Sequence, residues 1–327
     1  MLKRRNLLVM SLVAAMSAGS GFAQEGKPES VTIVLPHGVG GGQDRLTREL
    51  GAVWEKYLGV PVIYENVSGA SGRKGFDFFL RQPKDGSFVL SSNLASASIM
   101  YRQQKPDWDW KESVYALGMF AVDPGAFFSL KDSGYETLSD VIESAKEKPM
   151  TVGLAFWASP DNIVVHQVMK QSGAQFQVVP IGGGSDTVTA VLGKHVDIGF
   201  TKVANIEGNE DMKFLAVSME KNPVGDITDN APTVNSVIDT KTVSSASYRG
   251  IVLPAEVVKE KPEIAKWLSD TLEQAKDDPD FIAAAERDGV NPNLIVDMSH
   301  EEIMSVIEGY WEAFDEYGEI LNEAKSD

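Results

Sequence analysis

The feature that most constrains the fold is a short apolar segment that runs into a glycine-rich loop and then into a helical pattern. Residues 31–35 are almost entirely apolar, and the loop Pro36–Asp44 contains four glycines. Apolar residues then recur at helical spacing from Leu46 to Tyr57, and Gly59 ends the pattern. A strand that leads through a glycine loop into a helix is typical of a parallel α/β sheet.

The same alternation continues along the chain. Strands are predicted at 62–64 and 88–90, with a helix at 75–81 between them and a polar loop at 91–93. The further predicted elements are strands at 117–122, 151–155, 177–180 and 196–200, helices opening at Thr137, Pro160 and Asp186, and C-terminal helices at 262–276, 279–287 and from Ser299 onward. The chain therefore predicts an α/β protein with largely parallel sheets.

The first 23 residues are typical of a secretory signal peptide. Lys3, Arg4 and Arg5 precede a short apolar segment, which ends in small residues at Ala23. We expect cleavage after Ala23 and export to a periplasm-like compartment. An uncleaved anchor is the alternative, but the apolar segment is short for a span of about 20 residues.

Charge and cysteine content exclude several classes of function. The chain has 30 Lys and Arg against 47 Asp and Glu, a net charge of −17, which becomes −20 without the signal peptide. This balance argues against nucleic acid as a partner. The absence of cysteine excludes a disulfide, a thiol nucleophile and a Cys-ligated metal. The four histidines are scattered and no nucleophile elbow occurs, so we predict no catalytic residue, no metal site and no cofactor.

Three loops between a strand and a helix are candidates for binding an anion. The first, Gly38–Gln43, precedes a helix N-terminus, whose free N–H groups attract negative charge. It lacks the Lys-Ser/Thr ending of a P-loop, and Gln43 departs from the dinucleotide fingerprint. A simple tight turn is the alternative, and His37 within this loop is a candidate contact.

The second and third loops, Ala155–Asp161 and Gly182–Ser185, have the same position between strand and helix. A capped helix with buried aromatic residues explains the second loop equally well. His166, on the helix that follows, is predicted to be a packed structural residue. Together the three loops indicate a binding site, because open α/β sheets bind ligands at the carboxyl ends of their strands.

Several segments in order along the chain carry a family resemblance. They are Pro36–Asp44 with Arg48, Glu65–Gly72, Pro83–Gly86, Val179–Gly184, Leu192–Asp197, Ala231–Val234 and Tyr248–Pro254. In this order they resemble the substrate-binding proteins of tripartite tricarboxylate transporters, the Bug-type receptors. The resemblance covers essentially all of residues 24–327.

That resemblance implies a two-lobed periplasmic-binding-protein-like α/β fold, type II-like, in which each lobe is a mostly parallel sheet flanked by helices. Lobe one is expected at 24–123 plus 246–327, and lobe two at 124–245. The implied function is that of a monomeric periplasmic receptor, which captures a small organic carboxylate and delivers it to membrane permease subunits. A sensor that presents the ligand to a signalling kinase and an exported enzyme on the same scaffold remain open.

The resemblance also implies the ligand contacts, chiefly backbone N–H groups of two facing loops. These are His37, Gly38, Val39, Gly40, Gly41, Gly42 and Gln43 in the first loop, Trp157, Ala158, Ser159 and Asp161 in the second, and Ser92, Asn93, Gly183 and Thr201 at the rim.

The second loop departs from the family pattern. Phe156, Trp157 and Ala158 replace small residues, and Asn162 stands where His is common. Trp157 could fill the pocket or stack on a planar ligand. Lys202 could pair with a second carboxylate of the ligand, or it could face solvent.

Overall fold

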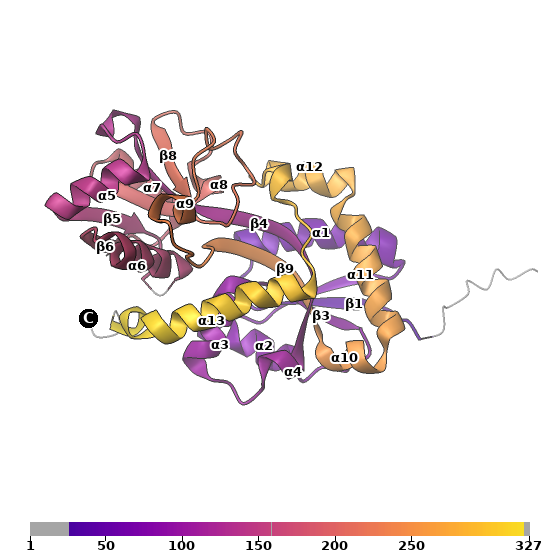
Figure 1. Ribbon diagram of the computed structural model, residues 1–327. Helices are drawn as coiled ribbons and strands as arrows, with labels where there is room; N and C mark the ends of the chain where they lie inside the picture. The colour runs from indigo at the N-terminus through magenta and orange to yellow at the C-terminus, as the bar shows by residue number, and fades with distance from the viewer. Residues whose placement is uncertain (1–25, 158, 324–327) are drawn as a thin grey trace, which may run out of the picture.

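A computed structural model describes residues 26–157 and 159–323. The predicted signal peptide with its cleavage point at Ala23, and the predicted contact Ala158, lie outside the described residues. The strands form one curled sheet in the order β2-β1-β3-β9-β4-β7-β5-β6, with β8 paired to β4. Helices flank this sheet (Figure 1). Within the described ranges, no helix has the length and hydropathy needed to cross a membrane.

The first half of the chain forms the predicted βαβαβ unit. Strand β1 pairs in parallel with both β2 and β3. The elements are β1 (Val31–Leu35), α1 (Gly42–Leu58), β2 (Val62–Asn66), η1 (Ala70–Gly72), α2 (Arg73–Phe79), β3 (Phe88–Asn93), α3 (Leu94–Gln104) and α4 (Trp110–Ser113). The predicted polar loop 91–93 is wrong, because these residues extend β3 by pairing with a strand from near the end of the chain.

Two antiparallel strands join the halves of the sheet. Strand β4 (Val114–Leu130) pairs with β9 (Ala246–Pro254) as far as Pro124, and with β7 and β8 from Gly125 onward. At Gly125 a Cβ atom would lie 2.6 Å from the Ser245 carbonyl oxygen, so only glycine fits where β4 changes partners. Figure 1 shows β4 and β9 passing between two groups of elements.

The second half repeats the parallel arrangement. Strand β5 pairs in parallel with β6 and β7. The elements are η2 (Lys131–Ser133), α5 (Leu138–Glu147), β5 (Met150–Leu154), α6 (Pro160–Ser172), β6 (Phe176–Pro180), α7 (Gly184–Leu192), β7 (Ile198–Lys202), α8 (Val203–Ile206), β8 (Met212–Val217) and α9 (Val234–Ile238). The predicted caps are confirmed, since Thr137 and Asp140 form a capping box and Ser159 caps α6.

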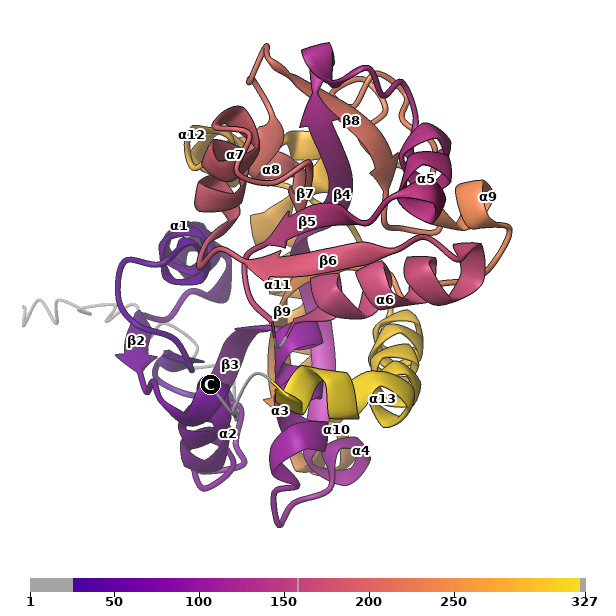
Figure 2. The same ribbon diagram turned by 90° about the vertical axis from the view of Figure 1, so that its left-hand side faces the viewer.

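The C-terminal segment returns to the first half. Its elements are α10 (Ala255–Glu260), α11 (Pro262–Lys276), α12 (Pro279–Arg287), η3 (Pro292–Leu294) and α13 (His300–Glu323), so the predicted helices 262–276 and 279–287 are confirmed. Helices α11 and α12 contact α1, whereas α13 contacts α3 and also reaches α6 in the second half. Figure 2 shows α13 running beneath α6 and beside α3.

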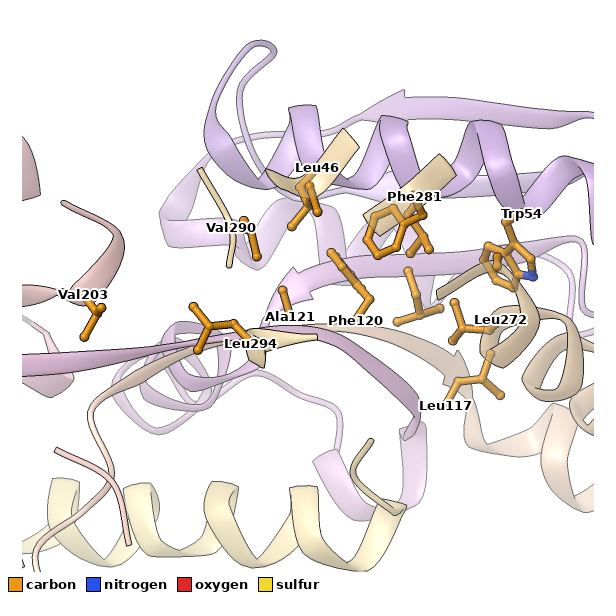
Figure 3. Close-up of a cluster of buried hydrophobic side chains, with 14 of the residues drawn as sticks. Leu46, Trp54, Leu117, Phe120, Ala121, Val203, Leu272, Phe281, Val290 and Leu294 are labelled. Carbon is orange, nitrogen blue, oxygen red and sulfur yellow. The ribbon is translucent and has the colours of Figure 1, made fainter. Parts of the chain in front are cut away.

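The largest apolar core lies between the sheet and the helices α1, α11 and α12. Leu46 and Trp54 of α1 meet Phe120 of β4, Leu272 of α11 and Phe281 of α12 (Figure 3). Full burial of each such side chain contributes roughly 1.5–3 kcal/mol. This core fixes α1, and therefore the loop that precedes it, against the sheet.

Candidate functional site

The first candidate loop connects β1 to α1 and leaves the start of that helix open. Gly41 is the N-cap residue and has no side chain to bond the first turn. Gly38–Gly41 are exposed, and Gly40 has a φ of +85°, a conformation that glycine adopts without strain. The first N–H groups of α1 are therefore available to an anion.

A buried carboxylate holds this loop in place. Asp44 accepts hydrogen bonds from the Gly40 N–H (2.9 Å), from Asn66 Nδ2 (2.9 Å) and from Arg48 Nε (3.1 Å). Asn66 Nδ2 also donates to the His37 carbonyl (3.2 Å). Burial alone would raise the pKa of Asp44, but the bonds from Arg48, Gly40 and Asn66 outweigh it and lower that pKa to about 2. The loop is thus anchored by an ionised side chain at neutral pH.

Polar residues at the end of β3 lie next to the first loop. Gln43 Nε2 donates to Ser91 Oγ (2.9 Å), and His37 Nε2 lies 3.4 Å from Ser92 Oγ. Burial lowers the pKa of His37, although Asp44 opposes this. Ser92 is buried, and the Asn93 side chain accepts from the Ala95 N–H as the cap of α3. The structure therefore brings Ser92 to the loop, whereas the Asn93 side chain is engaged in capping α3.

The second candidate loop folds back on the start of α6. The Trp157 carbonyl accepts hydrogen bonds from Asn162 Nδ2 (2.9 Å) and from the Ser159 N–H (3.0 Å). The Trp157 ring meets His166 edge-on, with ring centroids 6.4 Å apart. His166 is partly buried, as its predicted packing role requires. The Phe156 side chain of this loop is 59% exposed and therefore lies at the surface.

Asp161 and Lys202 form an internal ion pair. Lys202 Nζ lies 2.5 Å from Asp161 Oδ1 and 3.1 Å from Ser245 Oγ, and Ser245 also donates to Asp161. The exposed fractions of the Lys202 and Asp161 side chains are 18% and 8%. Lys202 is therefore not a solvent-facing lysine, and the carboxylate that it contacts in this conformation is Asp161 of the protein.

The third candidate loop packs against the end of β7. Gly183 is the N-cap of α7, without a side-chain cap. A Cβ atom on Gly184 would lie 2.7 Å from Thr201 Oγ1, and Asn205 Nδ2 donates to the same oxygen (3.3 Å). Thr201 lies next to this loop but is buried. In this structure its side chain packs beneath Gly184 and is not exposed at the edge of the proposed site.

Two charged residues at the junction of the sheet halves were not among the sequence predictions. Asp123 of β4 is buried and accepts from the Ala204 N–H (3.3 Å). Burial raises the pKa of Asp123 to about 6, against the opposing attraction of Arg249 and Lys202. Arg249 of β9 lies close to α1, since its Nη2 would be 3.9 Å from a Cβ atom on Gly42. The sequence pattern could have indicated both residues, because each places a charge within a predominantly apolar strand.

Among residues 26–157 and 159–323, no three His, Asp or Glu side chains converge as metal ligands do. The candidate groups are backbone N–H groups at helix starts, together with the cation Arg249. These groups can neutralise and orient a small anion.

Comparison with known proteins decides the family. Residues 46–322 match the model of the tripartite tricarboxylate transporter family receptor. The chain belongs to this receptor family. The resemblance seen in the sequence is thereby confirmed, and so is the expected two-lobed periplasmic-binding-protein-like fold.

Individual proteins and solved structures are similar to this chain over most of its length. A protein of the TAR-I ttuE-ttuC' intergenic region of Agrobacterium vitis is 25% identical over 282 residues, which cover 83% of this chain and 79% of that one. A TctC solute-binding protein from Polaromonas superposes with a TM-score of 0.77 at 19% identity, over 88% of this chain and 98% of that one. An R. palustris protein solved with adipate gives a TM-score of 0.65 at 18% identity, over 89% and 97%.

Proposed function

We propose that the protein is a periplasmic receptor that captures a small organic carboxylate between two lobes and delivers it to the permease subunits of a tripartite tricarboxylate-type transporter. The observation that carries this proposal is the start of α1. It is an uncapped helix N-terminus, presented by an exposed glycine loop and fixed from behind by Asp44. Membership of the receptor family gives that geometry a function.

The lobes are proposed at residues 24–123 plus 246–327 and at residues 124–245. The change of strand partners supports this division, because β4 leaves β9 after Pro124 and β9 begins at Ala246. Among the described elements, β4 and β9 run from one lobe towards the other, and α3 and α13 of lobe one contact α6 of lobe two. Such a pair of strands permits one lobe to rotate towards the other when ligand binds.

The ligand contacts are proposed to be backbone N–H groups of Gly38–Gln43 in lobe one and of Trp157–Asp161 in lobe two, apart from those of Gly40 and Ser159, which already donate within their loops. The α6 N-terminus follows β5 as α1 follows β1, so each lobe supplies one helix start at the carboxyl end of a strand. A carboxylate is the ligand chemistry that such N–H groups favour. The R. palustris relative with adipate supports small organic acids as the class to test.

A thermal-shift screen tests the receptor function directly. The purified protein is heated with mono-, di-, tri- and aromatic carboxylates, and with the diamide of adipate as a neutral control. A ligand at about 100 times its Kd should add roughly 2.7 kcal/mol to the stability, a shift of several degrees. If no carboxylate shifts the unfolding temperature and mass spectrometry finds none retained after purification, the receptor proposal fails.

Two further measurements separate this function from its alternatives. Recovery of the ligand unchanged after incubation distinguishes a receptor from an enzyme. Uptake of the labelled ligand into proteoliposomes that contain the permease should require the receptor, whereas a sensor would leave this uptake unaffected.

A further inference from the structure

The Arg249 guanidinium is a cation without a close partner. Within the described part of the chain it has no ion pair and no hydrogen bond, and its nearest opposing charges, Asp123 and Asp288, act on it only across a longer distance. Its neighbour Arg45 is different, because Arg45 Nε lies 2.6 Å from Asp288 and Arg45 Nη1 donates to the Gly40 carbonyl. Arg249 is partly buried, and withdrawing a cation from water without a counter-ion is costly, so this arrangement favours an anion beside Arg249.

The position of Arg249 indicates where that anion would bind. Its Nη2 lies next to Gly42, the first residue of α1, and this helix start has no side-chain cap. An oxygen of a carboxylate placed there would accept from the free N–H groups of the first turn and from the guanidinium together. The other cation of the junction, Lys202, is already neutralised by Asp161.

Asp123 is the acid that would respond to such an anion. The groups that face it are Arg249 from β9, Lys202 from the end of β7, the Ala204 N–H from α8, and Glu207 after that helix. A bound carboxylate beside Arg249 would draw the guanidinium away from Asp123 and add a second negative charge. Both effects favour the protonated form of a buried acid.

We propose that a carboxylate of the substrate binds between the first turn of α1 and Arg249, and that Asp123 takes up one proton from solvent as it binds. This inference rests on the proposed receptor function and assigns two residues to it. Arg249 makes the ion pair, and Asp123 keeps the net charge of the junction constant between the empty and the loaded states. The receptor would therefore bind its substrate more tightly at mildly acidic than at alkaline pH.

Calorimetry with adipate, or with the tightest carboxylate of the screen, tests Arg249. We expect Arg249→Gln to weaken binding by about 30-fold or more, and the matched control Arg287→Gln, on the exposed last turn of α12, to leave it unchanged. Circular dichroism and thermal unfolding establish that Arg249→Gln is folded. An Arg249→Gln affinity within threefold of the wild type would overturn the role of Arg249 and leave the receptor function standing.

The proton is measured on the wild type, so this test does not depend on a variant that folds. Binding enthalpies at pH 7 in phosphate and in Tris, which differ in ionisation enthalpy, should reveal proton uptake that approaches one proton per ligand. Asp123→Asn should abolish the uptake and bind more tightly than the wild type at pH 8. His37→Asn tests the other titratable side chain beside the start of α1, the His37 imidazole. No uptake by the wild type, or uptake that persists in Asp123→Asn and vanishes in His37→Asn, would overturn the proposal. Failure of every carboxylate to bind would overturn the receptor function itself.

Discussion

Lys202 Nζ lies 2.5 Å from Asp161 Oδ1, and both groups are largely withdrawn from solvent. The two residues come from different elements, the end of β7 and the first turn of α6, so their ion pair ties these elements together. A buried pair of this kind is costly to break, because either partner alone becomes an uncompensated buried charge.

Lys202→Met should therefore lower the free energy of unfolding by about 3 kcal/mol. The double variant Lys202→Met/Asp161→Leu should lose less than the sum of the two single variants, because it removes both charges. Urea denaturation of all four proteins measures this coupling. The control is Lys194→Met, which breaks an exposed pair with Asp132 and should cost under about 1 kcal/mol. Equal costs for the two lysine variants would contradict the buried-pair interpretation.

The raised pKa of Asp123 predicts a pH-dependent stability of the unliganded protein. Its pKa is about 6 in the folded state against an ordinary value of 3.8, so folded protein holds this proton more tightly than unfolded protein. The stabilisation from that proton is complete below pH 3.8 and is lost as the pH rises through 6. Asp123→Asn should escape this loss, and its stability relative to the wild type should increase by about 1–2 kcal/mol between pH 5 and pH 8. Denaturant unfolding at the two pH values measures the difference, and a constant difference would refute the assignment.

Two glycines in the first loop should respond differently to alanine. Gly40 has a φ of +85°, so Gly40→Ala should cost about 1–2 kcal/mol. A Cβ atom on Gly38 would meet nothing within 4 Å, and its φ is not positive, so Gly38→Ala should stay within about 0.5 kcal/mol of the wild type. Thermal unfolding of both variants tests the loop conformation. If Gly38→Ala proves the more damaging of the two, the loop does not adopt this backbone conformation in solution.

Asp44 should matter both to stability and to binding. Asp44→Ala leaves Arg48, Asn66 and the Gly40 N–H without their shared acceptor, at a cost of about 2–4 kcal/mol. Carboxylate affinity should fall as well, because the loop loses its anchor. Denaturation and calorimetry measure the two effects. Asp270→Ala, which breaks an exposed pair within α11, is the control and should change neither by much.

Salt should not abolish binding. Without residues 1–23, the expected signal peptide, the chain carries a net charge of −20, so at long range it repels an anion. Screening beyond about 8 Å at physiological salt removes that repulsion, while the contacts at α1 and Arg249 are much shorter. Stopped-flow association should become faster from low to moderate salt, and a steep loss of affinity would show that long-range attraction is responsible for capture.

Local patterns predicted most of the elements. The apolar runs near Val31 and Phe88, the capping box at Thr137 and the Ser159-Pro160 start of α6 all depend on neighbours in the chain, and each is present. The points at which strands begin and end were less predictable. Ser91–Asn93 is strand only because β9 pairs with it, and that partner lies more than 150 residues further along the chain.

The sequence marks Asp123 and Arg249 as charges that interrupt apolar strands, but which groups they face could not be predicted, for the same reason. Asp123 and Arg249 belong to adjacent strands that are distant in sequence, and the partner of Lys202 lies on another helix. The spacing of residues along the chain does not predict contacts between charges on distant segments. The glycine loops, in contrast, are recognised from their composition. The loops were therefore found, and the charges around them were not.

The position of β9 also determines when the protein can finish folding. This strand lies between β3 and β4, which precede it by well over a hundred residues, so both neighbours exist long before the strand that joins them. A chain made from its N-terminus cannot close the first half of its sheet until residues beyond 246 have emerged. Contacts between segments so far apart slow folding. The nascent chain consequently stays open for most of its synthesis, the state in which a polypeptide can still be threaded through a narrow channel.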